Sequence, residues 1–256
     1  MRESPVPWLD DDTPLPPTSR ALGPGSPAPG LLAAGGRLRV ERLREAYRHG
    51  VFPWFGPGQP PLWWAPDPRM VLPVADFVVS RSLRKTLRRF AADPRCEIHV
   101  DADFDAVIDA CARTPRAGQD GTWIVPEMLC AYRDWHVQGE AHSVEVRIGG
   151  ELVGGLYGVA LGRMFYGESM FAWRSDASKI ALAALVAFCR AQGIAWIDCQ
   201  QQTAHLASLG AREVPRALFE RHLALACGAA PVADWTYHRY HWQGLALEPP
   251  PTAAPA

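Results

Sequence analysis

The chain has 256 residues, and its 48% hydrophobic content is enough to form a buried core, which excludes a broadly disordered protein. Its 26 Lys and Arg nearly balance 27 Asp and Glu, so the net charge of -1 excludes a globally basic nucleic-acid binder but allows charges segregated into patches. Six dispersed cysteines, no signal-like start and no apolar run of membrane-spanning length predict a cytoplasmic protein with reduced thiols.

Both ends of the chain are rich in proline and lack a hydrophobic period, so we expect a disordered extension at 1–29 and a disordered tail at 246–256. Residues 30–70 contain one short amphipathic helix, predicted at 40–49, and then aromatic residues interrupted by prolines. This pattern is typical of a small irregular domain packed through aromatic side chains. The remaining residues, 71–245, are expected to form the larger domain.

The larger domain shows a regular succession of helix and strand signals. In chain order we expect a helix from Ser80 or Ser82 to about Ala91, a helix from Asp101 or Asp103 to about Arg113, a helix Pro126–Gln138, strands Ser143–Ile148, Glu151–Ala160 and Arg163–Tyr166, a helix Ala177–Ala191 after a cap at Asp176, and a strand Ile194–Gln200. The order predicts an α+β fold in which an antiparallel hairpin is followed by a buried crossover helix and a parallel strand.

The first of these helices concentrates positive charge on one face. Its cations recur at helical spacing: Arg81, Arg84, Lys85, Arg88 and Arg89. Such a face is often simply solvated, and no acidic residue lies on the helix to neutralise it. The sharper hypothesis is phosphate binding, because guanidinium groups match phosphate oxygens and a helix holds them in register.

Two places carry polar side chains that could act chemically. Strict alternation in the strand Ile194–Gln200 sends Asp198 and Gln200 to one face and Cys199 to the other, so Cys199 is interpreted as a core residue rather than a nucleophile. Glu168 follows a glycine directly after an apolar strand, where a loop would present it; a turn carboxylate is the plainer alternative. The His and Cys spacing does not predict a metal site.

A series of short motifs then points to a family. In chain order they are Gly50–Phe55, Trp63–Arg69, Gly121–Ile124, His142–Val146, Gly154–Val159, Gly167–Phe171, Ala177–Lys179, Asp198–Gln200 and His205–Ala211. In this order the chain resembles bacterial leucyl/phenylalanyl-tRNA–protein transferases from about residue 31 to residue 240. The resemblance implies a small N-terminal domain followed by a domain similar to the GNAT acetyltransferase fold, with a mixed sheet. We also expect a monomer.

The same resemblance implies a reaction: transfer of Leu or Phe, less well Met, from aminoacyl-tRNA to the N-terminal Arg or Lys of a protein, which marks that protein for degradation. Acetyltransferases hold CoA pyrophosphate with a glycine-rich loop, whereas the corresponding segment here, Arg174–Lys179, contains no glycine. No cofactor is therefore expected. The phosphates of the tRNA are the expected partners of the cationic helix face.

Residue roles follow from the resemblance in the same way. The aminoacyl side chain is expected in an apolar pocket formed by Trp54, Trp123, Leu156 and Met170. Glu168 and Asp198 are the candidate carboxylates for the cationic acceptor. The resemblance makes Asp198 and Gln200 the candidate catalytic residues, with Gln200 oriented by Asp198. Because an amide oxygen is a very poor base, we expect Gln200 only to position the attacking amine while Asp198 supplies negative charge.

Two alternatives remain open on the sequence. One is an N-acyltransferase that uses CoA thioesters, which the same fold would allow. The other is a non-catalytic tRNA-binding module, in which the basic helix works while Glu168, Asp198 and Gln200 are structural.

Overall fold

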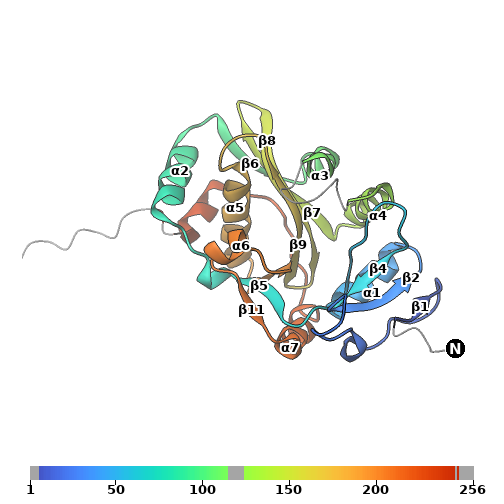
Figure 1. Cartoon of the computed structure of the whole chain (residues 1–256). Helices are drawn as coiled ribbons and strands as arrows, with labels where there is room; N and C mark the ends of the chain where they lie inside the picture. Colours follow the sequence, from blue (N-terminus) through green and yellow to red (C-terminus); the bar gives the residue numbers. More distant parts are fainter. Residues whose placement is uncertain (1–5, 115–123, 246, 248–256) are drawn as a thin grey trace, which may run out of the picture.

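The computed structural model describes residues 6–114, 124–245 and 247, which form two β-sheets with helices packed around them (Figure 1). The smaller sheet has the strand order β1-β2-β4-β3, in which β1 is parallel to β2 and the other pairs are antiparallel. Its strands are β1 (Trp8–Leu9), β2 (Leu31–Gly35), β3 (Phe52–Pro53) and β4 (Leu62–Trp64).

The prediction of disorder at 1–29 is wrong for the part that the structure describes. Trp8 and Leu9 pair with Ala34 and Gly35 as strand β1, and Leu9 is only 2% exposed. The 3-10 helix η1 (Thr18–Arg20) follows it. Proline-rich composition did not prevent packing here, because a two-residue strand needs only a few free backbone groups and one apolar side chain to bury.

Helix α1 (Val40–Arg48) lies between β2 and β3 and buries its apolar side, including Leu43, Ala46 and Tyr47, as the sequence predicts. It ends at His49 because Gly50 adopts a left-handed φ of 75°, the usual way in which a helix is closed. A side chain at Gly50 would also meet the ring of Phe219 at 3.2 Å. Gly50 therefore turns the chain sharply into β3.

The larger sheet is mixed and has the order β11-β5-β10-β9-β8-β7-β6. Its strands are β5 (Arg69–Pro73), β6 (Cys96–Val100), β7 (Ala141–Ile148), β8 (Glu151–Leu161), β9 (Met164–Ala172), β10 (Trp196–Gln200) and β11 (Arg212–Val214). Only β9 and β10 pair in parallel, and the expected hairpin turns at Gly149 and Gly150. The sequence did not predict β5, β6 and β11. Strand β5 pairs with β10, and β11 forms the edge of the sheet beyond β5.

Helices cover both faces of the larger sheet. Those after α1 are α2 (Arg81–Ala92), α3 (Phe104–Arg113), α4 (Pro126–Val137), α5 (Ala177–Ala191), α6 (Ala204–Ser208) and α7 (Arg216–Ala226), with 3-10 helices η2 (Val74–Asp76) and η3 (Arg239–Leu245). Helices α3 and α4 share one apolar cluster with the small sheet and α1, whereas α2, α5 and η3 share the other. Figure 1 shows α2 on the side of the large sheet that is remote from the small sheet.

Helix starts agree closely with the sequence. The Ser80 hydroxyl accepts from the backbone N–H of Leu83, and the Asp103 carboxylate accepts from that of Ala106, which confirms one of the two expected caps at each helix. Asp176 precedes α5 but makes no capping bond. The α+β fold with a mixed sheet is confirmed, while the domain division at residues 70 and 71 stays a prediction.

The C-terminal tail expected at 246–256 is described only at Leu247. Residues 246 and 248–256 of the expected tail lie outside the described residues, but Leu247 is buried and its carbonyl accepts a bond from Arg88. No helix within the described ranges is both long enough and apolar enough to cross a membrane.

Candidate active site

A cavity of about 780 Å³ opens between the carboxyl end of β10, the middle of β9 and the segment around β3. Its walls are mostly apolar, formed by side chains that include Phe52, Trp54, Leu156, Met170, Leu182, Leu185, Ile197 and Leu206. Glu168 and Gln200 also line it, and Glu168 is the one carboxylate among the described lining residues. A concave apolar site with a few converging polar groups is typical of a ligand-binding or active site.

Glu168 reaches the cavity through a β-bulge. The pairing of β8 with β9 passes from Gly158 opposite Gly167 to Tyr157 opposite Ser169, so Glu168 has no residue opposite it. A bulge re-aims the side chain of the extra residue. The expectation that a loop presents Glu168 is therefore wrong: β9 continues to Ala172, and a strand irregularity presents the carboxyl group.

Two phenols and an amide surround the carboxyl group of Glu168. The Tyr47 hydroxyl donates to Oε1 at 2.7 Å, and the Tyr132 hydroxyl donates to Oε2 at 3.1 Å. The two hydroxyls also contact each other. On the cavity side, Nε2 of Gln200 donates to Oε1 of Glu168 at 3.3 Å. Helix α1, helix α4 and strand β10 thus all meet at one carboxyl group.

This surrounding changes the acidity of Glu168. Burial raises the pKa of its carboxyl group from the ordinary value to about 7, and the nearby Asp198 acts in the same direction. The hydrogen bonds from Tyr47 and Tyr132 and the charge of Arg69 oppose the rise. Burial also raises the pKa of both tyrosines well above the usual value, so they remain hydroxyl donors at neutral pH. Glu168 is left as a group that exchanges its proton near neutrality.

Asp198 does not line the cavity. It is fully buried and forms a two-pronged ion pair with Arg69, with Nε to Oδ1 at 2.8 Å and Nη2 to Oδ2 at 2.6 Å. Oδ1 also accepts from the backbone N–H of Gln200 at 3.0 Å. Asp198 therefore contacts the main chain of Gln200, and no bond joins it to the amide side chain of Gln200.

The predicted alternation along β10 fails at its end. The register shifts between Asp198 and Gln200, and Gln200 has a left-handed φ of 56°. Cys199 and Gln200 consequently both line the cavity, although the sequence assigned them to opposite faces. Burial raises the pKa of the Cys199 thiol far above its ordinary value, so little of the reactive thiolate forms. Cys199 is a poor nucleophile because its thiol stays protonated. The reason is not, as alternation predicted, that its side chain points away from the candidate site.

The residues expected around the aminoacyl side chain come together as far as they are described. Trp54, Leu156 and Met170 line the cavity, whereas Trp123 lies outside the described residues. Trp54 is held by Trp64, whose indole N–H donates to the Trp54 carbonyl at 2.7 Å and whose ring packs against it edge-on. One wall of the cavity thus comes from the small sheet.

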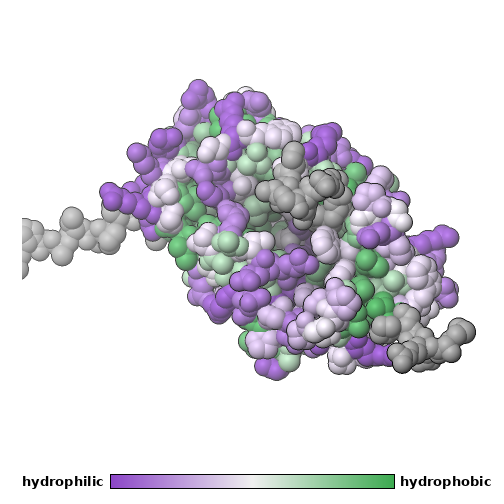
Figure 2. Space-filling model, viewed as in Figure 1, coloured by the Kyte–Doolittle hydropathy of each residue, from purple (hydrophilic) through white to green (hydrophobic). Residues whose placement is uncertain are grey.

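Helix α2 lies apart from this cavity and carries its cations outward. Leu83, Leu87 and Phe90 are buried on the inner side. On the outer side Arg81, Lys85, Arg88 and Arg89 are exposed and Arg84 is half-buried. In the described part of the chain Arg81, Lys85 and Arg89 form no ion pair. The region over α2 is correspondingly hydrophilic (Figure 2).

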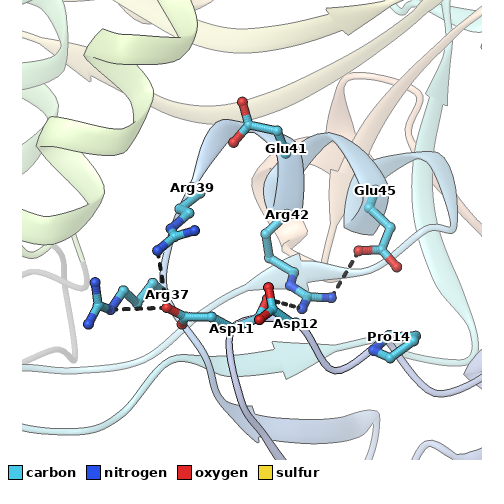
Figure 3. Close-up of a pocket in the computed structure, with 8 residues that line it drawn as sticks. All are labelled: Asp11, Asp12, Pro14, Arg37, Arg39, Glu41, Arg42 and Glu45. Atoms are coloured by element: carbon cyan, nitrogen blue, oxygen red, sulfur yellow. Dashed lines mark hydrogen bonds and ion pairs between the residues drawn. The ribbon is translucent and has the colours of Figure 1, made fainter.

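A second cavity, of about 550 Å³, is lined almost entirely by charged side chains (Figure 3). Arg37 and Arg39 both pair with Asp11, while Arg42 pairs with Glu45. The Arg42 guanidinium also donates to the carbonyls of Asp11 and Thr13. These ion pairs and hydrogen bonds fasten the segment after β1 to α1, which gives the cavity a structural explanation.

Sequence reasoning missed Tyr47, Tyr132 and Arg69. Tyr47 and Tyr132 lie on the apolar sides of amphipathic helices, where a tyrosine is indistinguishable from any other core aromatic. Arg69 did offer a signal, since it is the one charged residue of the otherwise apolar strand β5 (Arg69–Pro73). Among the residues that the structure describes, no three His, Cys, Asp or Glu side chains cluster closely enough to hold a metal ion.

Fold and site together define an α+β protein whose apolar cavity, with its buried carboxyl group, is built jointly by a small N-terminal unit and a mixed sheet. The family model for the leucyl/phenylalanyl-tRNA protein transferase matches residues 71–224, and the model for its N-terminal domain matches residues 36–67. The chain belongs to this family.

Individual relatives agree with the family models. A leucyl/phenylalanyl-tRNA–protein transferase of Methylibium petroleiphilum is 63% identical, covering 96% of this chain and 94% of the relative. One of Leptothrix cholodnii is 61% identical, covering 98% and 99% respectively. A solved GCN5-related N-acetyltransferase of Kribbella flavida aligns with a TM-score of 0.32 at 14% identity, over 66% of this chain and 59% of that one. This last likeness adds nothing to the fold that the strand order already defines.

Proposed function

We propose that the protein transfers Leu or Phe, and less well Met, from aminoacyl-tRNA to the N-terminal Arg or Lys of an acceptor protein, which marks the acceptor for degradation. The observation that carries the proposal is the cavity in which apolar walls meet Glu168 and Gln200, in a chain of this family. We further propose that the protein acts as a monomer in the cytoplasm, without a cofactor or a metal ion.

The apolar side of the cavity suits the donor side chain. Leu156, Met170 and Ile197 offer shape without polar groups, and a wall of that kind discriminates by only about 1–3 kcal/mol per methylene. Leu, Phe and Met differ in shape but share apolar character. A pocket that accepts all three with graded efficiency follows from these walls.

The polar side suits a cationic acceptor, and the contact is assigned to Glu168. Glu168 faces the cavity, whereas Asp198 is buried and already neutralised by Arg69. Asp198 is therefore not the carboxylate that binds the acceptor. Ionised Glu168 has no guanidinium or ammonium partner within bonding distance among the described residues, so it is free to attract the acceptor's positive charge.

Gln200 positions the attacking amine. Because its Nε2 donates to Glu168, its Oε1 is left to accept a hydrogen bond from the acceptor's α-amine. An amide oxygen is too weak a base to remove a proton, so this bond orients the amine without deprotonating it. The α-amine, with a reference pKa of about 7.7–8.0, is partly neutral at physiological pH.

Proton transfer is assigned to Glu168, whose raised pKa of about 7 suits a general base at neutral pH. The amine nitrogen attacks the ester carbonyl, and the ester C–O bond breaks as the amide C–N bond forms. The proton lost by nitrogen passes to Glu168 and from there to the released ribose oxygen. Asp198 acts indirectly, because its Oδ1 accepts a hydrogen bond from the backbone N–H of Gln200 and so holds Gln200 in place.

The deciding experiment is a transfer assay with Phe-tRNA and a peptide that begins with Arg. Transfer is expected to the Arg peptide and not to the same peptide with an acetylated N-terminus, and Glu168→Gln should lower kcat by about 10²-fold or more. Calorimetry with acetyl-CoA is run alongside. Tight acetyl-CoA binding without aminoacyl transfer would favour a CoA-dependent enzyme, and tRNA binding without transfer would favour a non-catalytic module.

A further inference from the structure

Arg69 is one of the most completely enclosed charged residues in the described chain, with a relative exposure of 1%. It opens strand β5, beside β10, and its guanidinium grips Asp198 through two nitrogens. The remaining terminal nitrogen, Nη1, donates to the carbonyl of Gly50 at 2.9 Å. The guanidinium carbon lies 4.7 Å from the ring centre of Phe52 and 4.8 Å from that of Phe219.

A purely structural role is a poor explanation for this arrangement. A buried ion pair contributes little net stability, since desolvation offsets the attraction, and well-packed apolar side chains often serve as well. What the pair provides is geometry, because a planar guanidinium fixes a carboxylate in distance and orientation. Each atom that Arg69 fixes belongs to a segment that lines the cavity or adjoins it.

On one side, the fixed group is Asp198, which holds Gln200. Gln200 has a left-handed backbone, a strained conformation for a non-glycine residue that persists only where the surroundings enforce it. The bond from the Gln200 N–H to Oδ1 of Asp198 supplies that enforcement. A carboxylate that rotated away would release the bond, and Arg69 prevents the rotation by holding both oxygens.

On the other side, the fixed group is the Gly50 carbonyl, at the start of the segment that carries Phe52, Pro53 and Trp54 into the cavity wall. The Arg69 guanidinium also lies over the ring of Phe52 in that segment. The same guanidinium thus ties a wall contributed by the small sheet to the strand end that carries Gln200.

We propose that Arg69 is a positioning residue for aminoacyl transfer, which braces Gln200 through Asp198 and at the same time sets the Phe52–Trp54 wall against it. The inference rests on the proposed function, in which Gln200 orients the amine. Lysine at this position keeps the positive charge but has one nitrogen, so it cannot hold both carboxylate oxygens and the Gly50 carbonyl together.

The test compares Arg69→Lys with Arg42→Lys in the transfer assay and by thermal unfolding. Arg42 is also buried and also bonds to carbonyls and a carboxylate, but it lies at the second cavity, away from the site. Arg69→Lys is expected to lower kcat by about 10²-fold at saturating substrates, as misplacement of a reacting group does. Arg42→Lys is expected to keep wild-type kcat whatever its effect on the unfolding temperature.

Two further measurements separate positioning from loss of structure. In a Gln200→Ala background the Arg69→Lys change should cost far less than in the wild type, because the group being positioned is already gone. Hydrogen exchange at the Gln200 amide should accelerate in Arg69→Lys, a readout that needs no activity and so stands even if the wild type transfers no amino acid. Any of three results would overturn the proposal. They are unchanged hydrogen exchange at the Gln200 amide in Arg69→Lys, a wild-type kcat for Arg69→Lys, and a double variant whose loss in kcat is the product of the two single losses.

Discussion

At the scale of single residues, the protonation of Glu168 is set by burial acting against hydrogen bonding. Burial disfavours the carboxylate and raises the pKa of Glu168 to about 7. The hydroxyls of Tyr47 and Tyr132 donate to the two carboxyl oxygens and oppose that rise. Proton exchange near pH 7 then follows from the packing of α1 and α4 around β9.

The acceptor affinity should therefore depend on pH. Because burial raises the pKa of Glu168 to about 7, the carboxyl group is neutral below that pH and anionic above it. KM for an Arg-starting peptide is expected to fall as pH rises through about 7. Tyr132→Phe removes a hydrogen bond that lowers the pKa of Glu168, so the midpoint should move to higher pH.

The wild type and Tyr132→Phe are assayed with the same peptide, whose α-amine titrates identically in both. The difference between their midpoints therefore excludes the contribution of that amine. The other groups facing Glu168 are Tyr47, whose pKa is raised well above this range, and the paired Asp198 and Arg69. A midpoint that stayed at the same pH in Tyr132→Phe would exclude Glu168 as the titrating group.

At the scale of elements, α2 concentrates positive charge on a nearly neutral chain, and we propose that it binds the phosphates of the tRNA. Its inner residues Leu83, Leu87 and Phe90 fix which face points outward, so five cations gather on the surface. Within the described residues Arg81, Lys85 and Arg89 form no ion pair, and several phosphates in register would neutralise their charge. The proposal that α2 holds the tRNA rests on these three side chains.

Reversing two of these charges should weaken tRNA binding in a salt-dependent manner. Lys85 and Arg89 are exposed, so Lys85→Glu with Arg89→Glu should leave the fold intact. The logarithm of the tRNA association constant falls linearly with the logarithm of the salt concentration. This slope should become shallower by about 0.7–0.9 for each phosphate that the variant no longer binds. The matched reversal of exposed Arg20 and Arg221, which lie on η1 and α7, should leave the slope unchanged. Equal slopes for all three proteins would remove α2 from the tRNA interface.

At the scale of the whole molecule, the site depends on the contact between the small unit and the mixed sheet. Tyr47 and the Phe52–Trp54 wall come from the small unit, while Glu168 and Gln200 come from the large sheet. A continuous apolar cluster joins the two. A change that separates the small unit from the mixed sheet is therefore expected to alter the cavity.

The segment before residue 30 is part of that unit and should contribute to stability. Leu9 is 2% exposed in β1, so Leu9→Ala is expected to lower the free energy of unfolding by about 2–5 kcal/mol, as removal of a buried leucine side chain does. Leu225→Ala is the control, because Leu225 is 78% exposed and its loss should change stability by about 0.5 kcal/mol or less. Urea unfolding measures both; equal midpoints would mean that β1 does not pack.

The sequence by itself determined the elements whose signals are local. Helical spacing located α2 and its cations, a serine and an aspartate located two helix starts, and alternation located the hairpin of β7 and β8. Its ordered motifs also identified the family. These features were readable because each depends on residues close together in the chain.

Only the tertiary structure decided how those elements meet. The bulge at Glu168 and the left-handed turn at Gln200 break the period-two rule that predicted their facing, and both are stabilised by partners far away in sequence. Tyr47, Tyr132 and Arg69 became visible as site residues only when α1, α4 and β5 were packed around β9 and β10. Long-range contacts of this kind set the position and the acidity of the candidate site groups, because burial and charge partners depend on residues that sequence spacing does not bring together.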